Sequence, residues 1–542
     1  MATADLRPVA DYIIVGGGTS GLVVACRLSE NPDVHVVVLE SGPDGTKDER
    51  VMDPAAYQSL EGSELDWKLK YRPQPSLNDR VLDNPAGKVL GGSSAINGMI
   101  YIAPSPAGID AWAHLGNPKW TWEKLAPYMR KSITLNVPET HPEIKENQRN
   151  PSTGPIQITY PSLTDISAQS LLGAWNDAFK ARGHSFNPDI LGEQQTLGPR
   201  PYAATIDPVS GLRSASHNQY AAVASARPNV SIVTEATVRR ILFDTNSLDA
   251  VASGVEFEYY GQVSTIQASN EIILAAGTFH TPKVLELSGV GDKERLESLG
   301  IPVIIDQPAV GTNLQNHLMS VLPVPLKPHS DLEDITPGIQ SLSMASLDSD
   351  EQNEILAAHS SEIKGTFEET IQSIIQNPHE ASSEFILGLV SPQLAIIAGI
   401  LSFPFSRGHV HISSADPYVP PEIDAQVASK EIDLDILARH MQNLHEFIRA
   451  EALNQFFQET VTVPDIESIK EGIRASGQLA HHACGTAAML PREKGGVVDE
   501  DLRVYGTRNL RIVDASIFPL IPHANPIATV YAVAERAADL IR

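Results

Sequence analysis

The chain has 542 residues, enough for two or three domain-sized units with a substantial hydrophobic core. Its hydrophobic content of 42% and charged content of 20% are ordinary for a soluble globular protein. The formal net charge of −26 argues against nucleic-acid binding, because neutralising phosphates requires clustered lysine and arginine, and it also disfavours an anionic membrane surface.

The two cysteines, Cys26 and Cys484, are too few for a disulfide framework or a zinc pattern of their own. The first predicted strand follows the N-terminus almost directly, so no secretory signal is expected and a cytoplasmic location is predicted. A signal already removed from the sequence is the alternative.

A dinucleotide-binding fingerprint opens the chain. Tyr12 to Val15 form a short apolar run that is typical of a buried parallel strand, and it leads directly into G-x-G-x-x-G, with Gly16, Gly18 and Gly21 at the glycine positions. Residues 22–28 then predict a helix. The glycines would provide a tight turn, close approach of the backbone to a pyrophosphate, and close packing of helix on strand, with the phosphates at the helix N-terminus.

A second apolar run, residues 34–39, ends in Glu40. An acid about 20 residues after the glycines bonds the adenosine ribose hydroxyls in folds of this kind. Strand, helix, second strand and carboxylate in this order favour a dinucleotide site over a simple glycine-rich turn.

A second glycine-rich stretch, at residues 88–98, reads Lys-Val-Leu-Gly-Gly-Ser-Ser-Ala-Ile-Asn-Gly. Two adjacent glycines followed by two serines suit a loop pressed against a ligand, with backbone N–H groups exposed to it. An ordinary glycine turn is the alternative, and the fingerprint upstream favours the ligand-binding interpretation.

Residues 108–132 predict packed helix-and-turn structure, in which Trp112, Trp120 and Tyr128 belong to the core rather than to a ligand site. Residues 138–165 are rich in Pro, Glu, Asn and Thr without a clear period, and they predict a surface connection.

A third strand-and-helix unit is predicted at residues 271–291. Its buried strand stops at Gly277, and Pro282 is placed for the first turn of the helix. Residues 230–243 and 254–257 supply further strand-like runs before it.

The middle of the chain, about residues 320–475, departs from this pattern and predicts a second domain inserted into the first. Residues 329–383 are polar and acidic, with helical spacing and no glycine fingerprint. Residues 385–405 are strongly apolar and would form core strands or, alternatively, line an apolar cavity. Two prolines and a glutamine interrupt this run, so a membrane span is not expected.

The C-terminal part returns to the first pattern. Residues 509–515 predict a strand that stops at Asp514, and a helix is predicted from Asn525 and Pro526, which are a good N-cap and a good first helical residue. The apolar positions of this helix lie along one face: Ile527, Val530, Tyr531, Ala534, Ala538 and Ile541.

Together these motifs resemble the glucose–methanol–choline (GMC) oxidoreductases, a family of flavin enzymes, nearly from end to end. The fingerprint with Glu40 is similar to their FAD-binding start, residues 88–97 to their first family motif, and residues 277–291 to the second. Val-Gly-Thr-Asn-Leu-Gln-Asn-His at 310–317 resembles their V-G-x-N-L-x-D-H, with an asparagine where an aspartate is more typical. Residues 496–516 resemble the segment that leads to their active site.

The resemblance places the chemistry at two C-terminal positions. The H-x-x-G-T element of the family corresponds to residues 482–486, which makes His482 the catalytic histidine, and the second active-site residue, a His or an Asn in the family, falls on Asn525. A histidine within reach of a substrate hydroxyl can take its proton, and a neutral amide can orient that hydroxyl without titrating. The N-terminus of the helix at Asn525 would stabilise negative charge on a reduced flavin.

Other roles for these residues stay open. His482 would otherwise be a structural or surface histidine, and Asn525 only a helix cap. A zinc site from His481, His482 and Cys484 is possible on paper, but ligands this crowded lack the usual spacing, so no metal is expected.

The resemblance implies an α/β fold, in which a Rossmann-like FAD-binding domain carries an inserted α+β substrate-binding domain. The FAD-binding domain is expected at residues 1–160, with the motif loop at 84–100, and again at 201–318 and 476–542; residues 161–200 connect it to the substrate-binding domain at 319–475. The residues expected to bind FAD are Gly16, Gly18, Thr19, Ser20, Gly21, Glu40, Gly91, Gly92, Ser93, Asn97, Gly98, Val238, Ala276, Gly277, Asp514, Ala515, Pro526 and Ile527.

Two departures from the family bear on the flavin. Members with a covalently attached flavin carry a histidine in the Gly-Gly-Ser-Ser stretch, where this chain has Ala95, Ile96 and Asn97, so non-covalent FAD is expected. Many members follow the Gly-Thr pair with a cysteine and a basic residue, where this chain has two alanines before Met489, and this alters contacts near the flavin.

The implied activity is FAD-dependent oxidation of a primary or secondary alcohol to an aldehyde or ketone, with hydride transfer to flavin N5 and His482 as the general base. The apolar run at 385–405 suggests an aromatic or otherwise apolar alcohol, and oxygen or another acceptor such as a quinone would reoxidise the flavin. A hydroxynitrile lyase on the same scaffold, without redox chemistry, is the main alternative. A light-driven fatty-acid decarboxylase, which needs a cysteine that the middle region lacks, and a non-enzymatic flavin-binding protein are the others.

Overall fold

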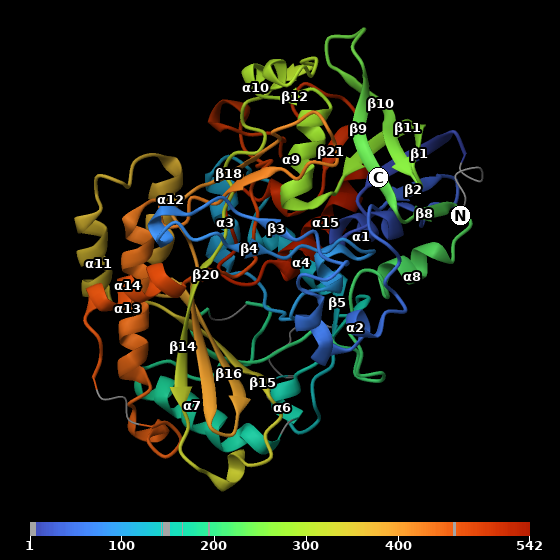
Figure 1. The fold of residues 1–542 in the computed structure, drawn as a ribbon. Helices are drawn as coiled ribbons and strands as arrows, with labels where there is room; N and C mark the ends of the chain where they lie inside the picture. The colour runs from blue at the N-terminus through green and yellow to red at the C-terminus, as the bar shows by residue number, and fades with distance from the viewer. Residues whose placement is uncertain (1–6, 142–143, 145–151, 165, 193–195, 459–461) are drawn as a thin grey trace.

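The computed structural model describes residues 7–141, 144, 152–164, 166–192, 196–458 and 462–542. Within the described part, most strands belong to two sheets, which occupy the upper and lower halves of the molecule in Figure 1. Residues 142–143, 145–151 and 165 of the predicted surface connection lie outside the described residues. The rest of that connection is not all surface, since Ile156–Ile158 forms a strand with both isoleucines buried.

The first sheet is built on the predicted N-terminal strand. β1 (Val9–Val15) pairs in parallel with β2 (Val36–Leu39) on one side and with β11 (Gln262–Leu274) on the other, and β8 (Val230–Val233) extends the sheet beyond β2. Ile13 and Ile14 of β1, all four residues of β2 and residues 272–274 of β11 are at most 1% exposed. Burial on both faces is why they are continuous apolar runs rather than alternating patterns.

The far side of β11 has two partners. Residues 262–267 pair antiparallel with β10 (Val251–Tyr259), which in turn pairs with β9 (Ala236–Asp244), while residues 272–274 pair in parallel with β21 (Leu510–Ile512). The predicted strand at 271–277 was therefore only the C-terminal part of β11, which ends at Leu274. The predicted run at 230–243 is two strands, β8 and β9, because the chain turns at Glu235, whose φ is 58°.

The glycine fingerprint brings the first helix against the sheet. α1 (Thr19–Leu28) begins three residues before the predicted start, with Gly18 as its N-cap residue. A Cβ on Gly21 would lie 2.0 Å from the carbonyl oxygen of Gly16, and a Cβ on Gly16 would lie 2.4 Å from that of Ala275. Only glycine fits such close approach of helix, turn and neighbouring strand.

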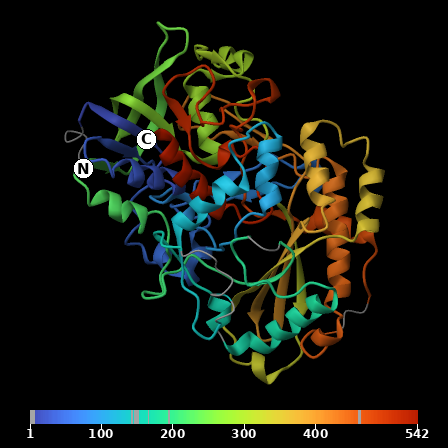
Figure 2. The ribbon, with the colours of Figure 1, turned by 180° about the vertical axis from the view of Figure 1, so that it is seen from behind.

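The C-terminal helix returns to the N-terminal unit. α15 (Ile527–Ile541) packs against α1 and against α4 (Trp122–Ser132), and Figure 2 shows it in red between the blue and cyan segments. α15 is buried on nearly all sides and not only along the predicted face. α3 (Pro106–His114) and α4 confirm the helices predicted at 108–132, and Trp112 is fully buried in the core.

The second sheet is antiparallel throughout. Its order is β20 (Gln478–Leu479), β14 (Leu318–Pro325), β17 (Leu394–Leu401), β16 (Ser383–Ser391), β15 (Gly338–Ala345) and β7 (Gly198–Pro201).

The apolar run at 385–405 forms most of the β16–β17 hairpin, whose turn falls at Pro392 and Gln393. The core-strand interpretation is thus confirmed. α13 (Glu431–Phe447) packs on β17, with α14 (Ile466–Ser476) beside α13 (Figure 1).

The prediction of helices across 329–383 is partly wrong. α11 (Ser349–Ala358) and α12 (Thr366–Ile375) are helical as expected, but residues 338–345 form β15. Across the described chain, no helix combines the length and apolar character needed to span a membrane.

Candidate active site

A cavity of about 680 Å³ extends from the C-terminal ends of β1 and β2 to His482 and Asn525. The carboxyl ends of parallel strands, where the chain order switches, are the usual binding place in open α/β sheets. The walls come from residues 15–20, 39–41, 84–100, 275–287, 480–483, 514–515 and 525–530, with further residues from other loops.

All but two of the predicted cofactor-binding residues line this cavity, and the exceptions are Gly21 and Gly91. Gly21 serves the packing of α1 on the fingerprint turn. Gly91 has a φ of 98°, and a Cβ there would lie 2.8 Å from Nδ1 of the buried His217. These two glycines allow the backbone to pack tightly behind the cavity wall, and their direct contact with a cofactor stays a prediction.

Glu40 stands at one end of the cavity, where β2 ends, and is 6% exposed. Its Oε2 accepts a hydrogen bond of 2.8 Å from the backbone N–H of Gly17, and its Oε1 one of 2.7 Å from that of Gly42. Burial raises the pKa of Glu40 to about 7, although these N–H groups oppose the shift. The carboxyl group therefore holds the glycine turn in place while facing the cavity at the predicted spacing.

Asp514 organises the wall opposite. It follows β21, and its Oδ2 accepts hydrogen bonds from the backbone N–H of Gly277 at 2.9 Å and from Oγ1 of Thr281 at 2.6 Å. It thereby satisfies the N–H group of Gly277 at the start of α9 (Gly277–Leu287), which no intrahelical carbonyl can reach. Burial raises the pKa of Asp514 against the lowering effect of these hydrogen bonds.

Pro282 lies inside α9 and not in its first turn, contrary to prediction. Because proline has no N–H, the carbonyl of Thr278 loses its partner within the helix. Thr486 supplies the missing donor, since its Oγ1 donates to that carbonyl at 2.5 Å, and Oγ1 of Thr278 donates to the carbonyl of Ala483 at 2.8 Å. α9 is thus tied directly to the segment that carries His482.

His482 is 7% exposed and is held through both ring nitrogens. Its Nε2 lies 2.9 Å from Nδ2 of Asn525, an amide group that can only donate, so Nε2 is the accepting nitrogen. Its Nδ1 lies 2.8 Å from Nδ1 of His317, a residue to which no sequence pattern assigned a role. The two residues predicted from the resemblance are in contact, and a third completes the group.

Asn525 does not cap a helix. α15 begins at Ile527 with Pro526 as its N-cap residue and no side-chain capping bond, so the predicted capping role is wrong. The amide turns toward His482 instead, and its Oδ1 is buried without a hydrogen-bond partner among the described residues. Pro526 and Ile527 line the cavity, so the N-terminus of α15 faces it as expected.

Backbone pairing places His317 beside His482. Gln315 and Cys484 exchange two backbone hydrogen bonds of 3.0 Å, and the carbonyl of His317 accepts one of 2.9 Å from the N–H of Ala480. The ladder continues into the pairing of β14 with β20. Two segments far apart in the chain therefore form one short antiparallel element beside the cavity.

Asn316 fastens this element. Its Oδ1 accepts hydrogen bonds from the backbone N–H of His317 at 2.9 Å and of His482 at 2.8 Å. Its Nδ2 donates at 2.9 Å to Oη of Tyr71, which in turn donates at 2.7 Å to Oδ1 of Asn84. An aspartate, more typical of the family motif, has no N–H to give to Tyr71, so asparagine suits this chain of donors.

The imidazoles at the site are neutral. Burial lowers the pKa of His482 well below its ordinary value, and His317 and His481 lower it further. Burial also lowers the pKa of His317 to about 4 and that of the neighbouring His523 to about 3. A neutral imidazole with a bare Nε2 is the form that can accept a proton.

The cavity is poor in positive charge. Among the described lining residues only Lys88 and Lys283 carry cationic side chains, and no contact that the structure describes joins either to His482 or Asn525. Lys283 donates to the carbonyl of Pro417 at 2.6 Å, and burial lowers its pKa to about 8.

Part of the lining is apolar and comes from Tyr57, Ile96, Met99 and Ile100. Ile100 packs on a hydrophobic cluster that contains Ala524, the neighbour of Asn525, which places apolar surface near the catalytic pair. None of residues 385–405, all of which the structure describes, lines the cavity, so the cavity-lining alternative for that run is wrong.

Within the described part of the chain, no three His, Cys, Asp or Glu side chains are grouped so that they could hold a metal ion. Both ring nitrogens of His482 already have partners, and Cys484 is fully buried. The zinc alternative therefore finds no support.

Two family models match the chain, both described as GMC oxidoreductase, one over residues 10–319 and the other over residues 404–534. Among curated relatives, the GMC oxidoreductase family protein Mala s 12 of Malassezia sympodialis is 33% identical, over 98% of this chain and 92% of its own. The dehydrogenase xptC of Emericella nidulans is 32% identical, over 98% of this chain and 93% of its own.

Solved structures agree with these matches. An FAD-dependent oxidoreductase from Chaetomium thermophilum superposes with a TM-score of 0.88 at 28% identity, over 98% of this chain and 99% of its own. A fungal aryl-alcohol oxidase superposes with a TM-score of 0.84 at 27% identity, over 99% of each chain. A formate oxidase superposes with a TM-score of 0.85 at 26% identity, over 98% of each chain.

Proposed function

This chain belongs to the GMC oxidoreductase family, and the solved structures that resemble it include FAD-dependent oxidoreductases. We propose that it oxidises an uncharged, apolar alcohol to an aldehyde or ketone, with His482 as the general base. The observation that carries the proposal is the bare Nε2 of a neutral, buried His482 beside the amide of Asn525. The enzyme class follows from the family; the substrate and the residue roles are the proposal.

The residues present fit FAD. A Cβ on Gly92 would lie 2.8 Å from Cα of Gly18, so the two glycine-rich loops meet without side chains between them. Residues 16–20 and 92–93 would hold the pyrophosphate, Glu40 the adenosine ribose, and residues 514–515 and 526–527 the flavin. Non-covalent attachment of FAD stays a prediction, based on Ala95, Ile96 and Asn97 standing where covalently flavinylated members carry a histidine.

The catalytic pair explains how an alcohol is held and deprotonated. The amide of Asn525 occupies Nε2 of His482 in the structure, so an entering hydroxyl must take its place, donating to Nε2 while its oxygen accepts from Nδ2 of Asn525. His482 Nε2 then takes the hydroxyl proton. Bound FAD supplies the acceptor for the hydride that leaves the carbinol carbon, which completes the two-electron oxidation.

The lining favours an uncharged substrate. An anion such as formate would need a cationic partner to offset its desolvation, and no described lysine or arginine contacts His482 or Asn525. The apolar side chains of Tyr57, Ile96, Met99 and Ile100 instead suit an aromatic or aliphatic body. The expectation of an apolar substrate therefore rests on these four side chains and not on residues 385–405, which do not line the cavity.

The test is anaerobic mixing of the FAD-loaded enzyme with a panel of benzylic and aliphatic alcohols and with formate. Alcohols with an apolar body should bleach the flavin absorbance, and formate should not. Bleaching by formate alone would overturn the proposal. If no alcohol bleaches the flavin, a non-redox role such as that of a hydroxynitrile lyase takes its place. Parallel oxygen-consumption and dye-reduction assays then identify the electron acceptor.

A further inference from the structure

We propose that His317 is a positioning residue that sets the tautomer of His482, accepting the Nδ1 proton of that ring and so keeping Nε2 free as the base. The inference rests on the proposed function, since it concerns how the base is prepared. It assigns a role to a residue that contacts neither the cavity nor the position of the substrate.

The contact itself leaves room for one proton. Nδ1 of His317 and Nδ1 of His482 are 2.8 Å apart, the two ring planes are perpendicular, and both rings are buried. Two bare nitrogens at this distance would repel, and two N–H groups would clash. Therefore one ring donates and the other accepts, and the choice decides which nitrogen of His482 faces the cavity unprotonated.

The surroundings settle the direction. Nδ2 of Asn525 can only donate to Nε2 of His482, so a neutral His482 carries its proton on Nδ1. On the other side, burial lowers the pKa of His317, so that ring is neutral and one of its two nitrogens carries no proton. A proton on Nε2 of His317 leaves its Nδ1 bare. Donors and acceptors then run in one direction from Asn525 through His482 to Nδ1 of His317, whose Nε2 is buried without a hydrogen-bond partner among the described residues.

The structure also shows what His317 prevents. Oδ1 of Asn525 is buried without a partner among the described residues. If His482 carried its proton on Nε2, a rotation of the Asn525 amide would let Oδ1 accept it, and the base would be blocked by a satisfied hydrogen bond. An acceptor fixed at Nδ1 makes this arrangement costly, because Nδ1 of His317 would then face a bare nitrogen.

His317 is well placed for a fixed acceptor. Its backbone carbonyl pairs with Ala480, and Asn316 bonds the backbone N–H groups of His317 and His482 together. Its ring is fully buried, which holds it in one orientation beside His482. The arrangement resembles the orienting partner of a catalytic histidine elsewhere, except that a neutral ring stands where a carboxylate would have to be desolvated.

The kinetic test compares His317→Leu, which removes the acceptor, with His317→Asn, whose Oδ1 falls near the position of the lost Nδ1. We expect His317→Leu to lower the rate of flavin reduction by about 10²–10⁴-fold at every pH, as loss of the correct tautomer does, with KM little changed. His317→Asn should recover to within about tenfold of wild type, since an acceptor is restored. His440→Leu is the control, because His440 is equally buried but bonds Ser382 away from the site.

Tautomer is measured directly by nitrogen NMR of the FAD-loaded enzyme labelled at its histidines, with His482→Gln identifying the signals of His482. Wild type and His317→Asn should show His482 protonated at Nδ1 alone, and His317→Leu should show protonation at Nε2. A wild-type ring protonated at Nε2, or an unchanged ring in His317→Leu, would overturn the proposal. The spectrum reports the tautomer of His482 even if the enzyme oxidises no alcohol, so failure of the proposed function is recognised separately. If His317→Leu does not fold, the tautomer of His482 in wild type and in His317→Asn tests the proposal.

Discussion

The environment of His482 lowers its pKa well below the ordinary value for histidine. The ring lies in a nearly closed setting, where forming the imidazolium costs desolvation, and the neighbouring rings of His317 and His481 lower the pKa further. A base works only while it is neutral. Lowering its pKa therefore lowers the pH at which protonation of His482 begins to reduce the rate. It does not change the rate at alkaline pH, where His482 is already neutral.

This sign gives a pH prediction. From mildly alkaline pH down through 6.5, the ordinary pKa of histidine, the rate of flavin reduction should stay constant, and it should fall only at lower pH. Anaerobic stopped-flow reduction in a buffer series measures the rate, and the flavin absorbance reports that the cofactor stays bound. A half-loss of rate at or above pH 6.5 would contradict the assigned environment of His482.

Two substitutions at opposite ends of the cavity serve as each other's controls. His482→Ala should keep FAD but slow flavin reduction by about 10²–10⁴-fold, the usual contribution of a general base. Glu40→Ala should do the opposite, because it removes the acceptor for Gly17 and Gly42 and loosens the turn, so the cofactor is lost first. Retained absorbance after gel filtration and the reduction rate distinguish the two. Equal loss of FAD in both variants would argue against separate roles.

The residues that carry chemistry were within reach of sequence reasoning to different degrees. His482 and Asn525 sit in family motifs, so the resemblance located them, and the structure brings them into contact. His317 also stands in a motif, but its partner is 165 positions away, and no local pattern announces a contact formed by backbone pairing. A histidine in a family motif without an assigned role was the available signal.

At the scale of elements, α9 is joined to the segment that carries His482 at the point where the helix lacks one of its own hydrogen bonds. Pro282 frees the carbonyl of Thr278, and Thr486, four residues after His482, donates to it. The helix therefore has one carbonyl that only a side chain from the active-site segment satisfies. Loss of that hydroxyl leaves a buried acceptor without a partner.

Thr486→Val tests this link, since valine keeps the shape and removes the donor. We expect the free energy of unfolding to fall by about 1–3 kcal/mol, the cost of an unsatisfied buried polar group. Thr486→Ser restores the hydroxyl and should recover most of the loss. Urea unfolding monitored by fluorescence compares the three proteins. A valine variant as stable as wild type would show that the carbonyl finds another partner.

Element boundaries were predictable where burial is uniform and misleading where it is not. The parallel strands β2 and β21 are short and fully buried, and the C-terminal part of β1, residues 13–15, is buried and apolar, so these strands were found nearly in place. β15 was taken for helix because it lies in a polar, acidic stretch and its identity depends on pairing with β16 and β7. Such pairing is a property of the sheet, and the strand's own sequence does not specify it.

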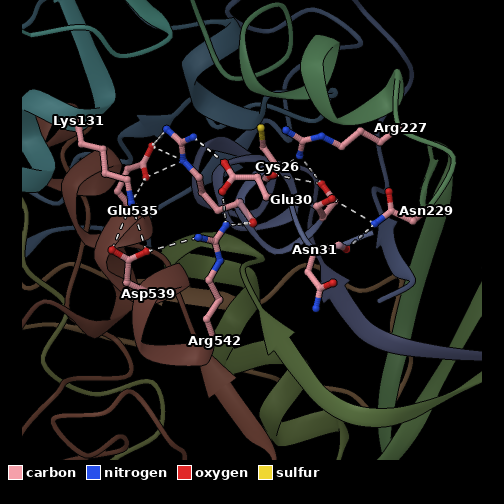
Figure 3. A network of polar contacts seen from close by, with 11 residues as sticks. Cys26, Glu30, Asn31, Lys131, Arg227, Asn229, Glu535, Asp539 and Arg542 are labelled. Atoms are coloured by element: carbon pink, nitrogen blue, oxygen red, sulfur yellow. Dashed lines mark hydrogen bonds and ion pairs between the residues drawn. The ribbon is translucent and has the colours of Figure 1, made fainter. Parts of the chain in front are cut away.

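At the scale of the whole molecule, a buried carboxylate links the two ends of the chain, whose helices α1 and α15 also pack on each other. Glu535 of α15 has no exposed surface, and it receives hydrogen bonds from Arg27 of α1 through two guanidinium nitrogens, the shortest at 2.7 Å. Oη of Tyr220 donates to it at 2.8 Å, and Nζ of Lys131 in α4 lies 3.2 Å away. Figure 3 shows Glu535 beside Lys131, in a network that also contains Asp539 and Arg542.

The network matters for function because α15 and α1 both begin at the cavity, α1 with the fingerprint and α15 beside Asn525. Holding the two helices against each other holds the cofactor end and the catalytic end of the site in a fixed relation. The sequence could not show this, since Arg27 and Glu535 are 508 positions apart.

Glu535→Gln removes the charge while keeping the size of the side chain. It leaves the guanidinium of Arg27, whose side chain is only 18% exposed, with Glu30 as its remaining carboxylate partner. The free energy of unfolding should therefore fall by about 1.5–3 kcal/mol, the contribution of hydrogen bonds to a charged group. Asp83→Asn breaks the exposed pair between Lys70 and Asp83 and should cost less than about 1 kcal/mol. Urea unfolding followed by FAD release measures both, and the glutamine variant should release the cofactor at a lower urea concentration. Equal effects of the two substitutions would mean that the ends of the chain are held by apolar packing of α15 on α1 alone.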